Sequence, residues 1–567
     1  MTGNPIIRRE LLSALRTRKA ILMQAAYLLV AGALVLLYWP AGGIQDIAGQ
    51  EAQEMFGVLA VGELVLVILF APAFTAASLT GEREHNTLES LYTTTMKPYE
   101  IVLGKIVGSL GFLMLLILSG IPALALPFLL GGVEGRQLLA VVGILIMTGL
   151  YLGMLGLLVS ARSHRSYRAI ITSYAVLLVV CFLVAMPATP LSGHLLARGG
   201  PAWQAVWHAL ASLSPIEAML SLVWPGHPWA GGAANMPPFW MIYLPLCVVT
   251  TLAVTAYCLV KLRRPVAPPR PREKLKVVER GQVSARTFLF IVDPRKRKRD
   301  IQWWQNPMLV KEFRTRPMLQ GQWLLRAVGW CIIIAVLLMI GQVLAIKAVM
   351  ADRSGVAIIE EDLPSVAAAL IVIIVVLVGP AITGGTLVSD RESGVWDLIR
   401  TTRLSSWRIV SGKFQAAVIP LLLIVLAIIP TLFVLPFLVD FTVNLWPIVL
   451  RILAVVLMTV AFVAAAGMFF SGLCARTATA TAWTYALVLT MGLLTLLMLL
   501  GQSRFSDSVI RTVFVFSPLA AALEAAGNAT MRKYGIMWRH LLVVGAASFV
   551  MFNVAVFRVL QMRRASR

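Results

Sequence analysis

Two short charged segments lie between apolar runs, and each is followed by a Gly-Lys pair. Residues 81–95 read GEREHNTLESLYTTT and residues 389–403 read SDRESGVWDLIRTTR. The pairs that follow are Gly104-Lys105 and Gly412-Lys413. A phosphate-binding loop needs G-x-x-x-x-G-K-[ST], and both pairs lack the upstream glycine and the final hydroxyl residue. They therefore cannot hold a nucleotide.

Other catalytic signatures are also missing from the sequence. No serine lies in a G-x-S-x-G elbow, and no Asp, Glu or His set has metal-ligand spacing. The five cysteines lie in or beside apolar runs, where they act as small hydrophobic residues. We therefore expect no catalytic, cofactor-binding or metal site, and we expect that the protein is not an enzyme.

The elements that carry the charged segments are apolar enough for lipid. Hydrophobic residues make up 59% of the 567 residues and charged residues 13%. The mean hydropathy is +0.84. A bilayer span needs roughly 20 apolar residues, and such runs predict an all-α polytopic membrane protein of about 12 helices. The runs lie at 21–39, 56–79, 101–130, 137–160, 168–187, 239–262, 323–349, 365–388, 409–439, 445–474, 478–500 and 538–561. The long, proline-containing runs 101–130 and 409–439 are expected to be kinked or partly re-entrant.

The net charge of +23 has two interpretations, nucleic-acid binding or basic residues at the cytoplasmic ends of spans. The second is favoured, because the basic residues gather at span ends and in residues 263–301. The loops at 40–55 and 350–364 are acidic instead. Both termini and the basic, proline-rich linker are therefore predicted to be cytoplasmic, with the linker near anionic headgroups and a dedicated lipid-recognition role as an alternative.

The chain contains an internal repeat. Residues 72–105 and 380–413 match without a gap at 12 of 34 positions, where about two or three identities are expected by chance. NPIIRRE at 4–10 also matches NPMLVKE at 306–312, SAR at 160–162 matches CAR at 474–476, and LSPIEAML at 213–220 matches FSPLAAAL at 516–523. We predict two parallel six-span domains, 1–262 and 302–567, joined by the linker 263–301.

Each charged segment predicts a short amphipathic helix at the membrane surface. Residues 82–92 place Leu88 and Leu91 on one face, and residues 390–399 place Trp396 and Ile399 there. The threonines then end each helix, and the following lysine is expected at the headgroup level. A solvated interfacial helix is one interpretation. A shared partner surface better explains why polar identities recur in both copies.

The pattern GEREHNTLESLYTTTMKPYEIVLGK resembles the segment between spans two and three of ABC-2-type transporter permeases, typically E-R-E, G-T-L-E-x-L, T-T-P and G-K. This chain departs from it at Asn86-Thr87 and Met96-Lys97, and the second copy has Ser393-Gly394-Val395. The resemblance covers both halves, including the NP…RE entry, the AR turn before span five and the SP stretch before span six. Together these motifs, in this order, are specific.

The resemblance implies a permease of an ATP-binding cassette exporter in the cell (inner) membrane, recruiting two separate ATPase subunits per chain. ATP and Mg²⁺ would bind to those subunits. Segments 4–20 and 302–320, with Trp303 and Trp304, would be amphipathic connecting helices, and 188–238 and 501–537 extracellular caps. A second cytoplasmic contact would use Arg162 and Arg476. The ATPase-docking residues would be Glu82, Arg83, Glu84, Glu89, Thr93, Thr94, Lys105, Asp390, Arg391, Glu392, Asp397, Thr401, Thr402 and Lys413.

The alternative is a secondary transporter driven by an ion gradient, without an ATPase. It would need acidic residues near mid-membrane, and the predicted spans hold almost none. Charges in or beside spans are candidate substrate contacts, and they are Glu63, Arg326, Lys347 and Arg451. A membrane enzyme, the third alternative, lacks convergent polar residues at one face. The transported substrate is not indicated.

Overall fold

In the computed structural model, all regular secondary structure among the described residues is helical. These are 18–39, 50–76, 78–84, 98–163, 166–178, 180–181, 201–224, 237–262, 305–315, 329, 332–333, 335–336, 356–438, 446–475, 477–492, 495 and 505–564. The chain divides into two compact units, Met1–Val266 with Leu497–Ser506 and Ala267–Leu496 with Asp507–Arg567. Below, they are the first and the second unit.

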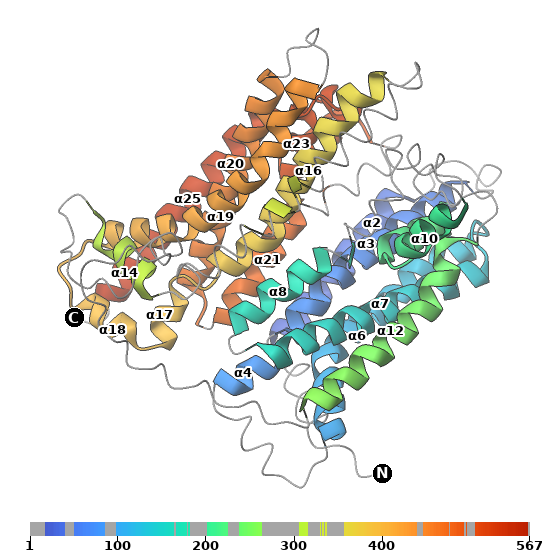
Figure 1. Ribbon diagram of the computed structural model, residues 1–567, viewed down its shortest axis with the longest axis horizontal. Coiled ribbons are helices and arrows are strands. Elements are labelled where there is room, and N and C mark those ends of the chain that lie inside the picture. Colours follow the sequence, from blue (N-terminus) through green and yellow to red (C-terminus); the bar gives the residue numbers. More distant parts are fainter. Residues whose placement is uncertain are drawn as a thin grey trace. The chain divides into compact units, whose positions relative to one another are not determined.

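In the first unit, α3 and α7 form the centre, and α6 and α12 pack against α7. The small residues Gly149, Gly153 and Gly156 let neighbouring side chains approach the α7 backbone. The short helix α4 lies at one end of the long helices and α10 at the other (Figure 1). The helices are α2 (Arg18–Leu37), α3 (Gln50–Thr75), α4 (Ser78–Glu84), α6 (Pro98–Leu129), α7 (Gly135–Arg162), α8 (Ser166–Leu178), α10 (Pro201–Ala211), α11 (Pro215–Val223) and α12 (Phe239–Leu262).

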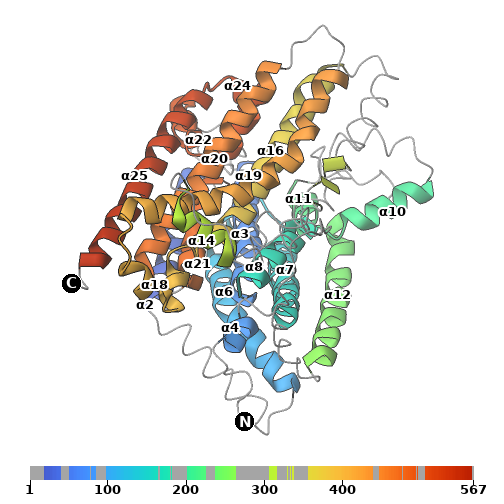
Figure 2. The ribbon, with the colours of Figure 1, turned by 60° about the vertical axis from the view of Figure 1, so that its left-hand side comes forward.

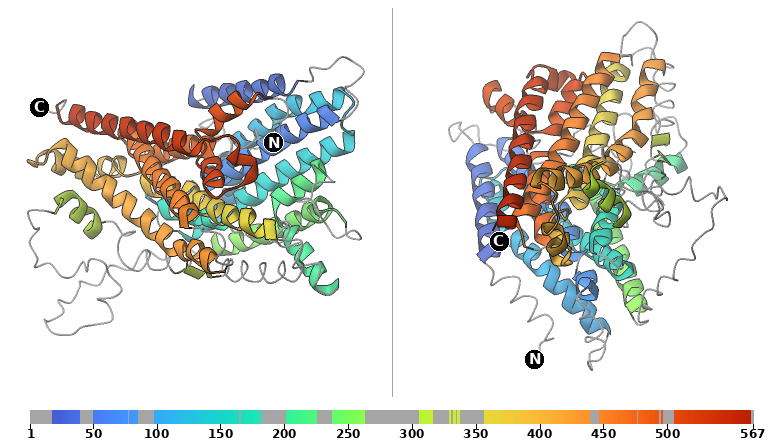
Figure 3. Two further views of the ribbon diagram at one scale, coloured as in Figure 1. Left: turned by 90° about the horizontal axis from the view of Figure 1, so that it is seen from above. Right: turned by 90° about the vertical axis from the view of Figure 1, so that its left-hand side faces the viewer.

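In the second unit, α20 is central and packs against α25, α16, α21 and α19. Figure 3 shows α19, α20 and α25 lying alongside one another. The short helices α14, α17 and α18 gather at one end of these helices, and α22 and α24 lie at the other (Figures 1 and 2). The helices are α14 (Pro307–Thr315), α16 (Val356–Thr383), α17 (Val388–Glu392), α18 (Val395–Arg400), α19 (Ser406–Leu438), α20 (Trp446–Leu473), α21 (Thr477–Gly492), α22 (Asp507–Phe514), α23 (Pro518–Ala525), α24 (Ala529–Arg532) and α25 (Met537–Arg564).

Seven helices among the described residues are long and apolar enough to cross a membrane, and an eighth span results if α22 and α23, bent by 104°, are counted together. These helices confirm an all-α polytopic membrane protein. The number twelve stays a prediction, since most of the run 323–349 lies outside the described residues. The helices α6 and α19 continue through their prolines, so the re-entrant alternative is wrong for both runs.

The short helix α11 of the first unit holds a buried acid. Glu217 is 5% exposed, and its Oε2 atom has no hydrogen-bond partner in the part of the chain that the structure describes. Burial raises the pKa of this carboxyl from 4.5 to about 8. The protonated form therefore persists in the folded protein at neutral pH.

This buried acid predicts a pH-dependent loss of stability. Between pH 4.5 and about 8 the unfolded chain ionises Glu217 while the folded protein keeps it protonated, so the free energy of unfolding falls as pH rises through that window. Glu217→Gln should flatten this dependence. Thermal unfolding of the detergent-solubilised chain across the window measures it, and equal slopes in the variant and the unaltered protein would contradict the prediction.

Candidate docking site at the repeated charged segments

The charged segment of the second unit is two helices, where the sequence predicted one over 390–399. The first, α17, ends at Glu392 and α18 begins at Val395. Gly394 lies between them with φ +72°, a left-handed conformation that interrupts a right-handed helix and favours glycine. As predicted, threonines close the segment: Thr401 and Thr402 donate their hydroxyls to the carbonyls of Leu398 and Ile399.

One face of α18 is buried, as its apolar pattern predicted. Trp396 and Ile399 pack in a hydrophobic cluster with Met308 of α14, Ile409 of α19 and Val559 of α25. The C-terminal helix also fixes the loop after α18, because the Arg563 guanidinium donates to the Thr402 and Leu404 carbonyls. The helices α14, α17 and α18, with the first turns of α19, form one packed assembly that we call the end layer.

The other face of α18 is open. Leu398 is 72% exposed and is flanked by exposed polar residues. Arg400 pairs with Asp397 on this face, Nε to Oδ1 at 3.3 Å. The remaining exposed residues of the segment are Glu392, Ser393, Gly394, Thr401, Thr402 and Arg403. An apolar side chain ringed by charges, on a helix anchored from behind, is a surface suited to a protein partner.

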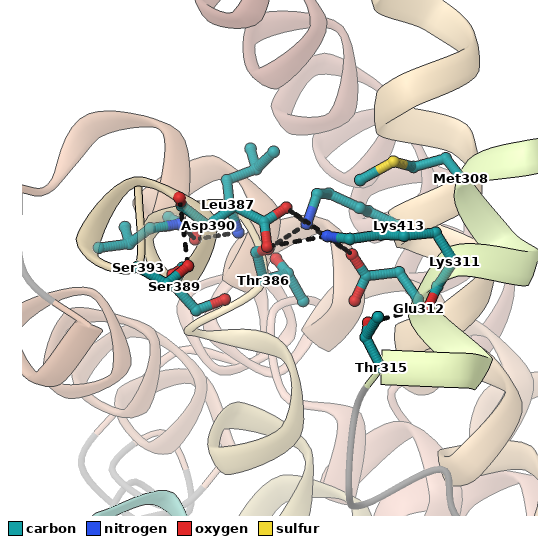
Figure 4. Close-up of polar contacts among 12 residues, drawn as sticks. Met308, Lys311, Glu312, Thr315, Thr386, Leu387, Ser389, Asp390, Ser393 and Lys413 are labelled. Atoms are coloured by element: carbon teal, nitrogen blue, oxygen red, sulfur yellow. Dashed lines mark hydrogen bonds and ion pairs between the residues drawn. The ribbon is translucent and has the colours of Figure 1, made fainter. Parts of the chain in front are cut away.

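Four charged side chains meet beneath α17 and form what we call the four-charge cluster (Figure 4). The Lys413 ammonium lies 2.6 Å from Asp390 Oδ2 and 2.8 Å from Glu312 Oε1. It also donates to the Thr386 carbonyl at 2.7 Å. Lys311 closes the group, with Nζ 3.0 Å from Asp390 Oδ1 and 3.2 Å from Glu312 Oε1. Two positive and two negative charges therefore bind α14, α17 and α19 together.

The Lys413 side chain is covered by the protein, and its predicted position at the headgroup level stays a prediction. The side chain is 1% exposed, although lysine is rarely buried without a partner. Its burial is tolerated because two carboxylates and a carbonyl surround the ammonium. The matching positions of the first repeat are Arg9, Glu10, Glu82 and Lys105, with the same signs of charge. Arg9, Glu10 and the side chain of Lys105 lie outside the described residues.

The two other charged residues of α17 close the ends of neighbouring helices. Arg391 donates to the carbonyls of Ser471, at 3.2 Å, and Cys474, near the C-terminus of α20. Glu392 accepts from the backbone N–H of Thr477 at 3.0 Å and from its hydroxyl, at the N-terminus of α21. Each charge thus meets the end of the helix dipole that it stabilises.

In the first unit Arg83 makes the same kind of contact. Its guanidinium donates to the carbonyls of Ala161, at 3.3 Å, and Ser163, where α7 ends. A contact within the chain, at the end of span four, therefore explains why this arginine recurs in both copies of the repeat. The predicted docking residues Glu89, Thr93 and Thr94 lie outside the described residues, as do the side chains of Glu84 and Lys105, and their roles stay predictions.

A serine near the end of span four contacts the start of each charged segment. Ser160 Oγ on α7 accepts the backbone N–H groups of Leu79, at 3.2 Å, and Thr80, at 3.1 Å. Ser471 Oγ on α20 accepts those of Leu387, at 2.8 Å, and Val388, at 3.0 Å. Leu387 and Val388 stand at the positions that match Leu79 and Thr80 in the sequence repeat.

These contacts correct the sequence alignment of span four. The match of SAR at 160–162 with CAR at 474–476 placed Arg162 opposite Arg476. By its contacts Ser160 corresponds to Ser471, which shifts the register by one helical turn and places Arg162 opposite Leu473. Arg162 is exposed, with its guanidinium 5.9 Å from the Tyr257 ring centroid, and Arg476 lies outside the described residues. Their role as a second contact stays a prediction.

Two of the charges predicted within or beside spans, Glu63 and Arg451, contact residues outside this site. Glu63 on α3 is 7% exposed and accepts a 2.7 Å hydrogen bond from the Tyr27 hydroxyl of α2. Arg451 donates to the carbonyl of Pro447 in the first turn of α20. Arg326 and Lys347 lie outside the described residues. Nor does the described part of the chain hold a group of three His, Cys, Asp or Glu residues placed to bind a metal ion.

Sequence reasoning did not select Lys311, Glu312, Ser160 or Ser471 as site residues. Glu312 closes the repeated NP…E motif, so its recurrence as Glu10 was a usable signal. The serines were hidden by the incorrect register of span four. Small residues recur so often in membrane helices that a match of two or three letters does not fix the alignment.

Two models of known protein families match the chain, one in each half. The family described as "ABC-2 type transporter" matches residues 5–226. A second, described as "ABC-2 family transporter protein", matches residues 360–557. Each match contains one copy of the repeated charged segment. Among curated proteins, none matches the chain.

Proposed function

Because the chain belongs to the ABC-2 type transporter permease family, and is therefore a multi-pass membrane subunit of an ATP-binding cassette transporter, we propose that ATP-binding subunits dock on the open face of α18 and on the matching segment of the first unit. Their ATPase cycle then drives export. In this proposal the end layer, both termini and the linker face the cytoplasm, and the protein resides in the cell membrane.

The observation that carries the proposal is the two-sidedness of α18. Trp396 and Ile399 hold the helix on the permease, while Leu398 projects from the opposite face. An exposed leucine between Asp397 and Arg400 offers an apolar anchor with a polar rim, the arrangement common at binding hot spots. The charges beside it do not suit contact with the hydrocarbon interior of a bilayer, and a protein partner fits this face better.

The proposal divides the predicted docking residues into two groups. Asp397, Thr401 and Thr402 lie on the open face and would contact the ATPase. Asp390, Arg391, Glu392 and Lys413 bind other helices of the permease and would position α18 instead of touching the partner. Two ATPases would bind per chain, one per repeat, and would supply the ATP and Mg²⁺ chemistry; this chain itself would bind no cofactor.

Leu398→Asp tests the docking face. Placing a carboxylate in an apolar contact should weaken ATPase binding at the second unit by at least about tenfold, since anchor residues contribute roughly 2 kcal/mol or more. The first unit is unaltered, so the stoichiometry should fall from two ATPases per chain to one. The permease is co-expressed with candidate ATP-binding subunits and the purified complex is weighed by light scattering or native mass spectrometry.

Val509→Asp is the matched control. Val509 is also an exposed apolar residue, on α22 at the other end of the second unit (Figure 2), and its replacement should leave the stoichiometry unchanged. Equal binding by the Leu398→Asp variant and the unaltered chain would remove α18 from the interface. Failure of the unaltered chain to bind any ATPase would contradict the docking proposal.

A further inference from the structure

We propose that span four, α7 in the first unit and α20 in the second, receives the motion of the ATPase through a reciprocal joint with the docking segment. By docking segment we mean the charged segment together with the two residues before it, so that it begins at Leu79 in the first unit and at Leu387 in the second. The joint consists of a serine and a glycine on span four and an arginine on the docking segment: Ser160, Gly156 and Arg83, or Ser471, Gly467 and Arg391. This inference rests on the proposed function and adds which span is driven and through which residues.

The serine supplies a helix cap from another helix. The first N–H groups of a helix lack intrahelical partners, and α17 has no side-chain cap of its own at Leu387. Ser471 of α20 accepts two of these N–H groups, and Ser160 of α7 accepts two in α4. All of these groups are buried, so while the helices stay packed no water replaces the hydroxyl if the serine is removed.

The arginine supplies the opposite cap. The last carbonyls of span four also lack intrahelical partners. Arg391 binds the carbonyls of Ser471 and Cys474, and Arg83 binds those of Ala161 and Ser163. Span four therefore caps the start of the docking segment, and the docking segment caps the end of span four. Neither helix moves along the other without breaking both sets of hydrogen bonds.

The glycine lies one turn before the serine on span four, where it lets the end of span two approach closely. A Cβ atom on Gly467 would lie 2.2 Å from Thr383 Oγ1, and one on Gly156 would lie 2.1 Å from Thr75 Oγ1. Thr75 and Thr383 end span two, just before the docking segments. The glycine and the serine lie four residues apart, on one face of span four. The end of span two and the start of the docking segment thus both pack on the same face of span four.

The same contacts occur in both units, which distinguishes this joint from the others on α17. The four-charge cluster links α17 to α19, and Glu392 links it to α21. Both give α17 further anchors in the second unit. Among the described residues, these hydrogen bonds to span four occur in both copies of the repeat, with the same residue types in the same order, while α4 and α17 also contact span five, α8 and α21. We therefore assign the transmission of motion to span four.

Single serine variants test the joint within one molecule. In the complex with its ATPases, hydrogen exchange is measured with and without a non-hydrolysable ATP analogue. Ser471→Ala should reduce the nucleotide-dependent change in α20 by at least about fivefold, the lower end of typical coupling. The change in α7 and α19 should persist. Ser160→Ala should give the reciprocal result, and Ser471→Thr, which keeps the hydroxyl, should retain the response of α20.

The outcomes separate this inference from the proposed function. The Ser471→Ala complex should still contain two ATPases, because α18 is unaltered. An unchanged response of α20 in that complex would overturn the joint and leave the docking proposal intact. So would equal losses in the alanine and threonine variants, because the hydroxyl would then be irrelevant. If the unaltered chain binds no ATPase, the docking proposal falls and the joint falls with it.

Discussion

Replacing Lys413 by Met should destabilise the second unit by about 3–5 kcal/mol, the usual cost of removing one partner from a buried ion pair. The side chain volume is nearly conserved, so the loss is electrostatic. Asp390 and Glu312 would lose this counter-charge and keep Lys311, and Glu312 is almost fully buried. Thermal or denaturant unfolding of the detergent-solubilised chain measures the change.

A second substitution separates charge imbalance from loss of packing. In Lys413→Met/Asp390→Asn the remaining charges are Lys311 and Glu312, which balance. The double variant should therefore be more stable than the sum of the two single effects by about 0.5–3 kcal/mol. Lys311→Met is the matched control: its side chain is 27% exposed, so it should cost less than Lys413→Met. Equal costs for the two lysines would contradict the account of Lys413 as the buried centre of the cluster.

The Gly467→Ala substitution is expected to destabilise the second unit by about 1–3 kcal/mol through overpacking. The new Cβ would lie 2.2 Å from Thr383 Oγ1 and 2.7 Å from the Thr383 carbonyl carbon. The backbone of α16 must therefore move. Because backbone atoms make part of the clash, adding Thr383→Ala should not restore stability. The measurement is the unfolding transition of the single and double variants.

The first unit should behave differently under the same substitution. At Gly156 the Thr75 hydroxyl makes the close contact, at 2.1 Å, and the nearest backbone atom is 3.5 Å away. Gly156→Ala should therefore be relieved by Thr75→Ala. Gly143→Ala is the control, since the new Cβ would have only Leu244 Cδ2 within 4 Å, at 3.9 Å. It should stabilise α7 slightly, by up to about 1 kcal/mol, because alanine favours helix. Relief in the second unit as well would show that the backbones are not in contact there.

The sequence could predict the spans closely, because a bilayer demands a fixed length of apolar residues. The run 239–262 coincides with α12, and the run 445–474 lies within a residue of α20. The apolar face of α18 was also predictable, because Trp396 and Ile399 are three residues apart. These are local properties, set by helical periodicity along one segment.

The direction of the charged side chains was not predictable in the same way. Asp390, Arg391 and Glu392 read as an exposed acidic helix, yet each binds a different helix of the permease. Their partners Lys311, Ser471 and Thr477 lie about 80 residues away in the chain. Periodicity does not indicate which distant element covers a polar face. The recurrence of these charges in both copies indicated that they make required contacts, and the structure shows that some of these contacts are with other helices of the same chain.

The left-handed Gly394 has a consequence for how such a protein can diversify. It separates α17, whose charged side chains bind the protein's own helices, from α18, whose outer face exposes Leu398. The first repeat has Asn86 at the matching position, and asparagine is the residue that most readily follows glycine into this conformation. Under the proposed docking, substitutions after Gly394 can therefore adapt the chain to a different ATP-binding subunit while the contacts of α17 stay as they are.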